Sequence, residues 1–337
     1  MTKSIENSSL TILTDPMPIK GLFFPYYILK FLKFLKFLKY SIYMRKYFQH
    51  KRYRGHFAVT RSLIEGLEKL NKAYTYNPTK LSQLSDTVLV LSGVKTLLQA
   101  IKLKQQGYIK ILFAGPNIVE FASDSNHLIF SDYIDCVVTP SEFITDLYLE
   151  DVIDLGEKPC VLAWPAGVNE SFWVSIGGME RKLVLVYCKY GNNYNEYLEY
   201  ILNSGYQYKV ITYGNYDQYE YKELLKYSCV CVCLTETSES QGIAWAEAWS
   251  MDVPTLVKSK KINTIKGRKF KCSSAPYLNK ENGLFFDDYK DFTSQFDYIM
   301  KYKGKFNPRS WVIENMTDKV SAKKMCTYIA SYNETIK

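Results

Sequence analysis

One stretch of the sequence, residues 229–257, restricts the fold more than any other. It reads CVCVCLTETSESQGIAWAEAWSMDVPTLV, with a short apolar run, a polar turn, a helix-forming segment entered near Gly242, and a second apolar run after Pro254. Two continuous apolar runs joined by a helix are typical of a strand-helix-strand unit in an open parallel sheet. The sequence therefore predicts an α/β fold built from such units.

Two acidic residues in this stretch, Glu239 and Glu247, are eight positions apart. That spacing is too long for one helical turn, so the pair makes sense only if Glu239 lies in the loop and Glu247 inside the helix. Glu239 can then face the cleft beyond the carboxyl end of the strand, where open α/β sheets bind ligands. Glu247 is expected one or two turns into the helix.

The alternation of strands and helices continues along most of the chain. Strands are expected at 10–13, 73–76, 87–91, 109–114, 133–139, 161–164, 183–187 and 208–213, and helices at 97–106, 196–202 and 221–225. This alternation of strands and helices is interrupted at about 169–181, where Gly177 and Gly178 indicate a linker. Strands alternating with helices at this spacing predict doubly wound parallel sheets.

The length of 337 residues is long for one core and sufficient for two domains. We therefore expect two facing Rossmann-like domains. The predicted parts are an N-terminal domain at 1–170 with a basic aromatic insertion at about 21–53, a linker at 171–180, a C-terminal domain at 181–307, and a wholly helical segment at 308–337 that returns to the first domain.

The composition is that of a folded protein with a surplus of positive charge. Hydrophobic residues make up 47% and charged residues 23%, and the formal charge of +9 favours an anionic partner. The eight cysteines contain no C-x-x-C pair or zinc spacing, which favours reduced core residues. With no apolar signal at the N-terminus and no run long enough to cross a bilayer, we expect a cytoplasmic protein, with peripheral membrane attachment as an option.

The segment from Phe31 to Lys39 reads FLKFLKFLK and predicts a basic amphipathic helix. One interpretation is a peripheral anchor whose lysines meet an anionic membrane surface. Another is a helix whose apolar face packs on its own domain. Nucleic acid ranks last, because no recognition motif accompanies the nearby arginines and tyrosines.

Four stretches, in this order along the chain, resemble the retaining GT-B glycosyltransferases of glycosyltransferase family four. They are VVTPSEFITDLY, PAGVNESFW, ESQGIAWAEA with its E-x7-E signature, and APYLNKENGLFF. The resemblance extends from about Gly55 to the C-terminus. It implies a GT-B fold, a nucleotide-sugar donor held mainly by the C-terminal domain, and a glycan or lipid-linked acceptor held by the N-terminal domain. It also implies retention at the anomeric carbon, and no cofactor beyond the donor substrate.

The resemblance assigns roles on the donor side. Glu247, matching the second signature glutamate, would accept hydrogen bonds from the ribose hydroxyls, and Glu239 would orient the donor sugar as a catalytic residue. The backbone amides at the helix start would receive the diphosphate. This set comprises Ser240, Gln241, Gly242 and Ile243.

The cations expected beside a diphosphate are only half present. No metal-binding Asp-x-Asp occurs, and Lys189 stands at the family's arginine position with no lysine a few residues on. A lysine acts as a point charge and lacks the planar fork of arginine. Lys266, Arg268 or Lys269, from a neighbouring loop, is a candidate for the missing cation.

On the acceptor side, Gly55 resembles the glycine of a loop that lets the backbone approach the donor phosphate and the acceptor. His56 follows it, and Asn117 follows a Gly-Pro pair after a strand. His56 and Asn117 are catalytic candidates, although a capping or surface role is an alternative for the histidine.

Two alternative functions stay open at this point. One is a nucleotide-sugar epimerase of GT-B fold. A histidine-rich cleft would favour that function, but the chain has only three histidines. The other is a non-catalytic adaptor for a membrane or an acidic partner, which the missing cation supports. No G-x-G-x-x-G or P-loop sequence is present, which argues against a standard dinucleotide or P-loop site.

Overall fold

The structure is a computed structural model and describes residues 10–15, 55–152, 159–174, 181–191 and 194–335. The predicted basic insertion at about 21–53, including the segment from Phe31 to Lys39, lies outside the described residues, and so do the linker glycines Gly177 and Gly178.

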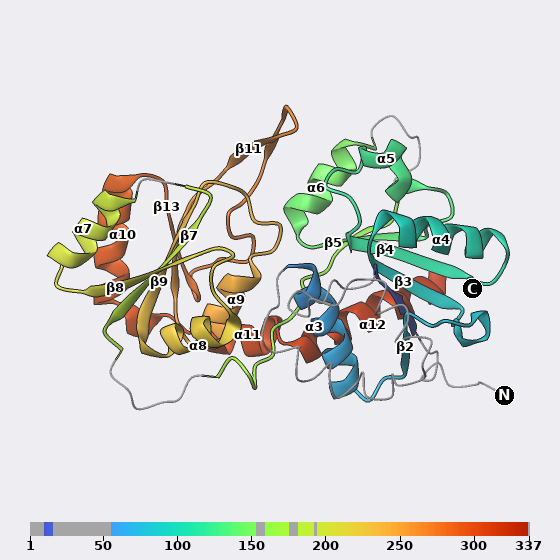
Figure 1. Cartoon of the computed structure of the whole chain (residues 1–337), viewed down its shortest axis with the longest axis horizontal. Coiled ribbons are helices and arrows are strands. Elements are labelled where there is room, and N and C mark those ends of the chain that lie inside the picture. The colour runs from blue at the N-terminus through green and yellow to red at the C-terminus, as the bar shows by residue number, and fades with distance from the viewer. Residues whose placement is uncertain (1–9, 16–54, 153–158, 175–180, 192–193, 336–337) are drawn as a thin grey trace.

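The first sheet is entirely parallel and lies on the right of Figure 1. Its strands, in spatial order, are β2 (Tyr74–Tyr76), β1 (Leu10–Leu13), β3 (Thr87–Ser92), β4 (Ile111–Asn117), β5 (Cys136–Thr139) and β6 (Val161–Ala163). The helical elements of this part are α3 (His56–Lys69), η3 (Leu81–Gln83), α4 (Val94–Gln105), α5 (Asp124–His127), η4 (Leu128–Phe130) and α6 (Glu142–Glu150).

Both faces of this sheet are covered, which explains why its central strands are continuously apolar. In β3, Val88 and Val90 belong to the core on the α4 side, and Leu89 and Leu91 belong to the core that contains residues of α3. Successive side chains of a strand point to opposite faces, so a strand between two helical layers needs apolar residues at every position.

The second sheet, on the left of Figure 1, is also parallel. Its strands, in spatial order, are β13 (Gly283–Phe286), β10 (Thr255–Lys258), β9 (Ser228–Thr235), β7 (Leu183–Lys189) and β8 (Gln207–Thr212). The helical elements of this part are α7 (Asn195–Asn203), α8 (Gln218–Tyr227), α9 (Ile243–Ser250), α10 (Tyr289–Lys301) and η5 (Lys303–Lys305).

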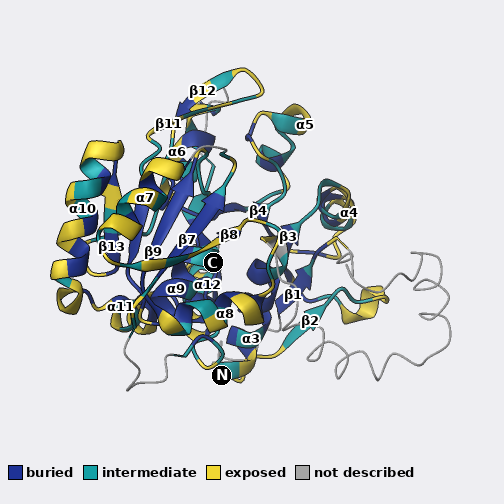
Figure 2. Cartoon of the chain, turned by 60° about the vertical axis from the view of Figure 1, so that its left-hand side comes forward, coloured by how far each residue is buried: buried dark blue, intermediate teal, exposed yellow. Residues whose placement is uncertain are grey.

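The central strand β9 is buried along all of its residues, as the dark strands of Figure 2 show. Cys231 and Cys233 face a core with the tryptophans of α9, whereas Val230 and Val232 face a core with the phenylalanines of α10. The alternating cysteines therefore act as small apolar core residues, and all eight cysteines of the chain are free.

The C-terminal helices, α11 (Pro308–Asn315) and α12 (Asp318–Thr335), return to the first domain. Residues of α12 share a core cluster with those of α3. Gly66 allows the close approach, since a Cβ there would lie 2.1 Å from the carbonyl oxygen of Asp318. Arg61 of α3 also binds Asp318 through two hydrogen bonds of 2.7 and 3.1 Å. The returning helix of the prediction is thus observed.

The helical segment predicted from residue 308 onward forms two helices, which are separated at Met316 and Thr317. The backbone N–H of Val168 donates to Met316 O at 2.9 Å, and Asp318 N–H donates to Val168 O at 3.1 Å. Because these groups pair with Val168, the helical hydrogen-bond ladder is interrupted there.

The α/β fold with two parallel sheets is confirmed, and most expected strands lie within a few residues of their predicted positions. Four elements of the second domain were missed: α10, β13, and the strands β11 (Ile262–Ile265) and β12 (Arg268–Lys271), which form an antiparallel hairpin. Within the described residues, no helix combines the length and apolar character needed to cross a bilayer. The domain boundaries themselves stay a prediction.

Candidate active site

Two neighbouring strands of the second sheet bring Lys189 and Glu239 together. Lys189 is the last residue of β7, and Glu239 lies in the loop after the adjacent strand β9. The Lys189 Nζ to Glu239 Oε1 distance is 2.5 Å, and the two side chains are 14% and 15% exposed. Parallel strands place their carboxyl ends at one edge, so residues 50 positions apart meet there.

The environment of Glu239 acts on its ionisation in two directions. Burial raises the pKa of its carboxyl, and the charge and hydrogen bond of Lys189 oppose that shift. The backbone is fixed as well, because Glu239 N–H donates to the carbonyl oxygen of Ser273 at 2.9 Å. Lys189 therefore favours the charged form of a carboxylate that burial alone would neutralise.

Glu247, inside α9 as predicted, is a half-buried carboxylate. Burial raises its pKa to about 8, against the opposing charge of Arg61. Among the described residues, none donates a hydrogen bond to its carboxylate. Nearby, the hydroxyls of Tyr187 and Tyr216 bond to each other at 2.9 Å. The negative charge of Glu247 contributes to the raised pKa of both phenols.

The start of α9 presents backbone N–H groups. Gly242 is the N-cap residue with φ of 77°, and a Cβ there would lie 2.4 Å from the Trp245 ring. Both facts favour glycine at this position. Within the described part of the chain, no group accepts a hydrogen bond from the N–H of Ser240, Gly242 or Ile243. Free N–H groups at a helix start form a site suited to an anion.

Gln241 has a structural role that the sequence did not predict. Its Nε2 donates to Ala166 O at 2.6 Å, and its Oε1 accepts from Ala166 N–H at 3.1 Å. The side chain thus joins the loop of the second domain to the segment after β6 of the first. Only its backbone N–H can serve a ligand in this arrangement.

Arg268, predicted to lie beside a diphosphate, binds acidic residues of the first domain. Its guanidinium bonds to Asp151 at 2.5 Å and lies 3.6 Å from Glu150 in the first domain. It also lies 5.0 Å from the ring centroid of Phe121. Its charge is therefore already paired, and it makes no contact with Lys189 or Glu239 within the described residues.

The predicted acceptor-side residues lie in the first domain, at two separate places. Gly55 has φ of 45° and open space around it, and His56 is the first residue of α3, with a side chain outside the description. Asn117 ends β4, and its Nδ2 is buried with no hydrogen-bond partner in the described part of the protein. No contact of Asn117 with Glu239 or Glu247 is found among those residues.

Four residues near this site were not anticipated. The charge of Arg61 opposes the raised pKa of Glu247, Ser273 holds the backbone of Glu239, and Lys258 ends β10 with its Nζ 2.6 Å from Glu236. Asn263 of β11 contacts the loop before Glu239. Arg61 did carry a signal, since it interrupts the apolar pattern of its helix and has an acid, Glu65, four residues on.

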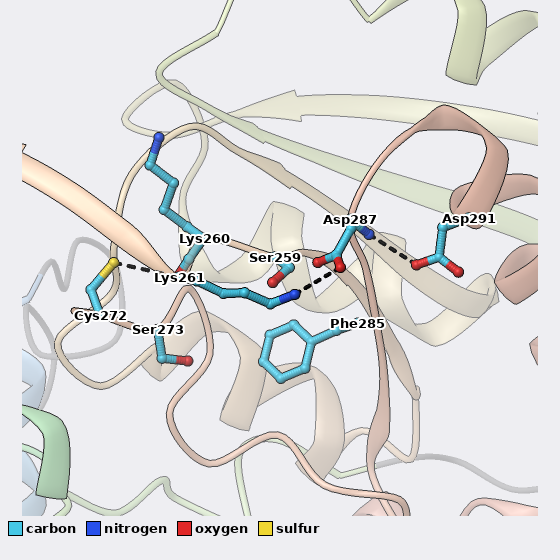
Figure 3. A pocket seen from close by; sticks show the side chains of 8 residues that line it. All are labelled: Ser259, Lys260, Lys261, Cys272, Ser273, Phe285, Asp287 and Asp291. Atoms are coloured by element: carbon cyan, nitrogen blue, oxygen red, sulfur yellow. Dashed lines mark hydrogen bonds and ion pairs between the residues drawn. The ribbon is translucent and has the colours of Figure 1, made fainter.

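A pocket of about 280 Å³ opens beside this site, at the base of the hairpin (Figure 3). Its lining residues are Ser259, Lys260, Lys261, Cys272, Ser273, Phe285, Asp287 and Asp291. None of the predicted site residues lines it, but Ser273 links it to Glu239 through the backbone bond described above. Among the described residues, no group of three or more His, Cys, Asp or Glu side chains is placed to hold a metal ion.

The fold of the GT-B glycosyltransferases has two parallel sheets and a last helix that returns to the first domain. Solved structures of this kind match nearly the whole chain. The apo form of the lipopolysaccharide outer core galactosyltransferase WaaB is 12% identical, with a TM-score of 0.56 over 96% of this chain and 99% of that one. HepE of Anabaena in complex with UDP is 9% identical, with a TM-score of 0.55 over 96% and 100%.

A glycosyltransferase from Rickettsia africae is 10% identical, with a TM-score of 0.51 over 98% of this chain and 99% of that one. No protein-family model matches the sequence, and no curated protein matches it. At such low identity, these similarities establish the fold of the chain.

Proposed function

We propose that this protein is a glycosyltransferase that moves a hexose from a nucleoside diphosphate sugar to a glycan or lipid-linked acceptor. One observation carries the proposal. The half-buried carboxylate of Glu247 accepts no hydrogen bond from the described residues, and it lies on the helix whose N–H groups follow the paired Glu239. The ribose hydroxyls of a donor can bind Glu247, its diphosphate can bind the N–H groups, and its sugar can lie against Glu239.

The structural similarities support this proposal. The Anabaena protein HepE has been solved with UDP and with UDP-glucose, and both structures share the fold over 96% of this chain. WaaB is described as a galactosyltransferase. A nucleotide-sugar donor is the ligand class that fits the charges and N–H groups of this site.

The donor would lie along the carboxyl edge of the second sheet. Glu247, when ionised, accepts hydrogen bonds from both ribose hydroxyls, because a carboxylate has acceptor sites for two donors. The diphosphate accepts hydrogen bonds from the backbone N–H groups of Ser240 to Ile243 and from the ammonium of Lys189. These contacts place the sugar against Glu239.

In the reaction, Glu239 would orient the hydroxyls of the donor sugar and stabilise positive charge on the ring as the bond to the diphosphate breaks. Lys189 has to serve two anions in turn. Its ammonium bonds to Glu239, and an incoming diphosphate would compete for it. A lysine can make this change because its charge sits at the end of a flexible stem.

The first domain would hold the acceptor. The Nδ2 of Asn117, which has no hydrogen-bond partner among the described residues, is a candidate donor to an acceptor hydroxyl, and Gly55 and His56 stay candidates beside the donor. We further propose retention at the anomeric carbon and transfer without a divalent metal, on the basis of the E-x7-E spacing and the lysine at the diphosphate position. A cytoplasmic location with the segment from Phe31 to Lys39 on an anionic membrane is part of the same proposal.

Nucleotide binding is the first test. UDP, GDP, ADP and CDP are each added to the full chain, and the ligand that binds raises the unfolding temperature by mass action. A shift with one of them supports the proposal and identifies the base. No shift with any of the four contradicts it and favours the non-catalytic adaptor.

Donor-sugar hydrolysis and transfer then separate an enzyme from a binder. Glu239→Gln keeps the shape of the side chain and removes the charge, so turnover is expected to fall by roughly 100-fold while nucleotide binding persists. Glu199→Gln, the same change at an exposed position of α7, is the control. Equal rates in wild type and Glu239→Gln would defeat the role given to Glu239.

A further inference from the structure

The hairpin of β11 and β12 is an insertion that belongs to neither sheet. It leaves the second domain after β10 and returns to it at Ser273. In Figure 1 it projects from the second domain beside α5 and α6 of the first. Its two ends make different contacts: the tip binds the first domain, and the base binds the loop that carries Glu239.

The contacts at the tip are ionic and cross between the domains. Lys266 lies 3.0 Å from Glu120 and 3.1 Å from Asp124. Arg268, 30% exposed, bonds to Asp151, which is only 9% exposed. Exposed ion pairs contribute little, so of the two the Arg268 pair is the more effective.

An apolar contact supports the same docking. Phe270 of β12 is buried in a small cluster with Phe121 and Leu147 of the first domain. The rings of Phe270 and Phe121 meet edge to face, with centroids 5.6 Å apart. The hairpin therefore has a docked position that is fixed by shape as well as by charge.

The base of the hairpin holds the loop before and at Glu239 from two sides. Asn263 Nδ2 donates to Ser238 Oγ at 3.0 Å and to Thr237 Oγ1 at 3.3 Å. Beyond β12, the carbonyl oxygen of Ser273 accepts the N–H of Glu239 at 2.9 Å. Cys272 and Ser273 lie at this base beside Lys260 and Lys261, as Figure 3 shows. The two strands are also closed against each other, since Cys272 N–H donates to Lys261 O at 2.9 Å.

We propose that the hairpin couples its docking on the first domain to the placement of Glu239, and that Arg268, Phe270 and Asn263 are positioning residues for the transfer reaction. The hairpin is a paired two-stranded unit, so a shift at its tip is carried to its base. When the tip is docked, Asn263 and Ser273 hold the loop in the position that faces the donor sugar. This inference rests on the proposed function only in its last step.

Hydrogen exchange tests the coupling without any enzyme assay. Arg268→Ala releases the tip, and Asn263→Ala cuts the connection at the base. Both are expected to speed amide exchange in residues 237–239 by roughly 10-fold, because that loop then opens more often. Lys271→Ala removes one positive charge from the same strand at an exposed position and is the matched control, with unchanged exchange. Unchanged exchange in Arg268→Ala would overturn the coupling, even if Asn263→Ala speeds exchange, because Asn263 contacts this loop directly.

Steady-state kinetics test the consequence for Glu239. Arg268→Ala is expected to lower kcat by roughly 10- to 100-fold with the nucleotide Kd unchanged, since misplacing a reacting group costs turnover. Arg268→Lys, which keeps the charge, should recover part of the loss. A change in Kd with kcat intact would contradict a positioning role. If the wild-type chain binds no nucleotide, the proposed function fails, and the exchange measurement still decides the coupling.

Discussion

Replacing Glu247 by glutamine should make the protein more stable and a poorer nucleotide binder. Burial raises the pKa of this carboxyl to about 8, whereas a glutamate in the unfolded chain titrates near about 4.3. Above the unfolded value, the unfolded chain holds the charge freely while the folded protein has to bury it or take up a proton. The wild-type protein therefore loses stability relative to Glu247→Gln as the pH rises from about 4.3 to 8.

The magnitude follows from the same shift. Each pKa unit corresponds to about 1.4 kcal/mol, so the full shift sets a ceiling of about 5 kcal/mol in the free energy of unfolding. Because the side chain is only partly buried, solvent screens its charge, and we expect roughly 1 to 3 kcal/mol at pH 8. Below about pH 4 both states are protonated and the difference disappears.

The assay is thermal unfolding of wild type and Glu247→Gln from pH 4.5 to 9. The difference in Tm should grow through this range and level off above pH 8, while nucleotide affinity falls by roughly 10-fold or more in the variant because two ribose hydroxyls lose an anionic acceptor. Glu199→Gln, on the exposed side of α7, is the control and should change neither quantity. A Glu247→Gln variant that is destabilised at pH 8, or that binds nucleotide as well as wild type, would refute the assignment.

Two further predictions concern the cations. Lys189→Met should weaken nucleoside diphosphate binding by roughly 10-fold and reduce its sensitivity to salt, and titration calorimetry at two salt concentrations measures both; equal affinity would exclude a phosphate contact. The full chain should co-sediment with anionic liposomes, and binding should weaken in high salt and when Lys33, Lys36 and Lys39 are changed to glutamine. Salt-insensitive binding, or none, would leave the packing interpretation of that segment.

The parts of the fold that could be read from the sequence are the buried parallel strands. All the residues of β9 are buried, and a strand covered on both faces has to be apolar throughout, which makes it visible. The helix α10 was also readable and was missed, since Phe292, Phe296 and Ile299 recur at helical spacing. The hairpin carries no such signal, because INTI and RKFK are short and Phe270 is the one buried residue in the two strands.

Some features of the site can be predicted from residues that are neighbours in the sequence, and others depend on residues far along the chain. The loop and helix positions of Glu239 and Glu247 follow from their spacing within one strand-helix unit. The partners of Gln241 and Arg268 do not, because Ala166 and Asp151 belong to the other domain and are 75 and 117 residues away along the chain. No local pattern specifies a contact that depends on how two domains meet.

The cations considered for the diphosphate are already paired with acidic side chains. Lys189 and Lys258 end strands of the second sheet, Arg268 lies in the hairpin after β10, and each already has a carboxylate within 2.6 Å. Such a cation has several N–H donors and can bind a diphosphate while it keeps its acid, but the acid offsets part of its charge, so charge alone gives less binding than a free lysine would. Affinity then has to come from the N–H groups of α9 and from Glu247, which have no competing partner among the described residues. Recognition of the whole nucleotide, rather than of its phosphates, is the expected consequence.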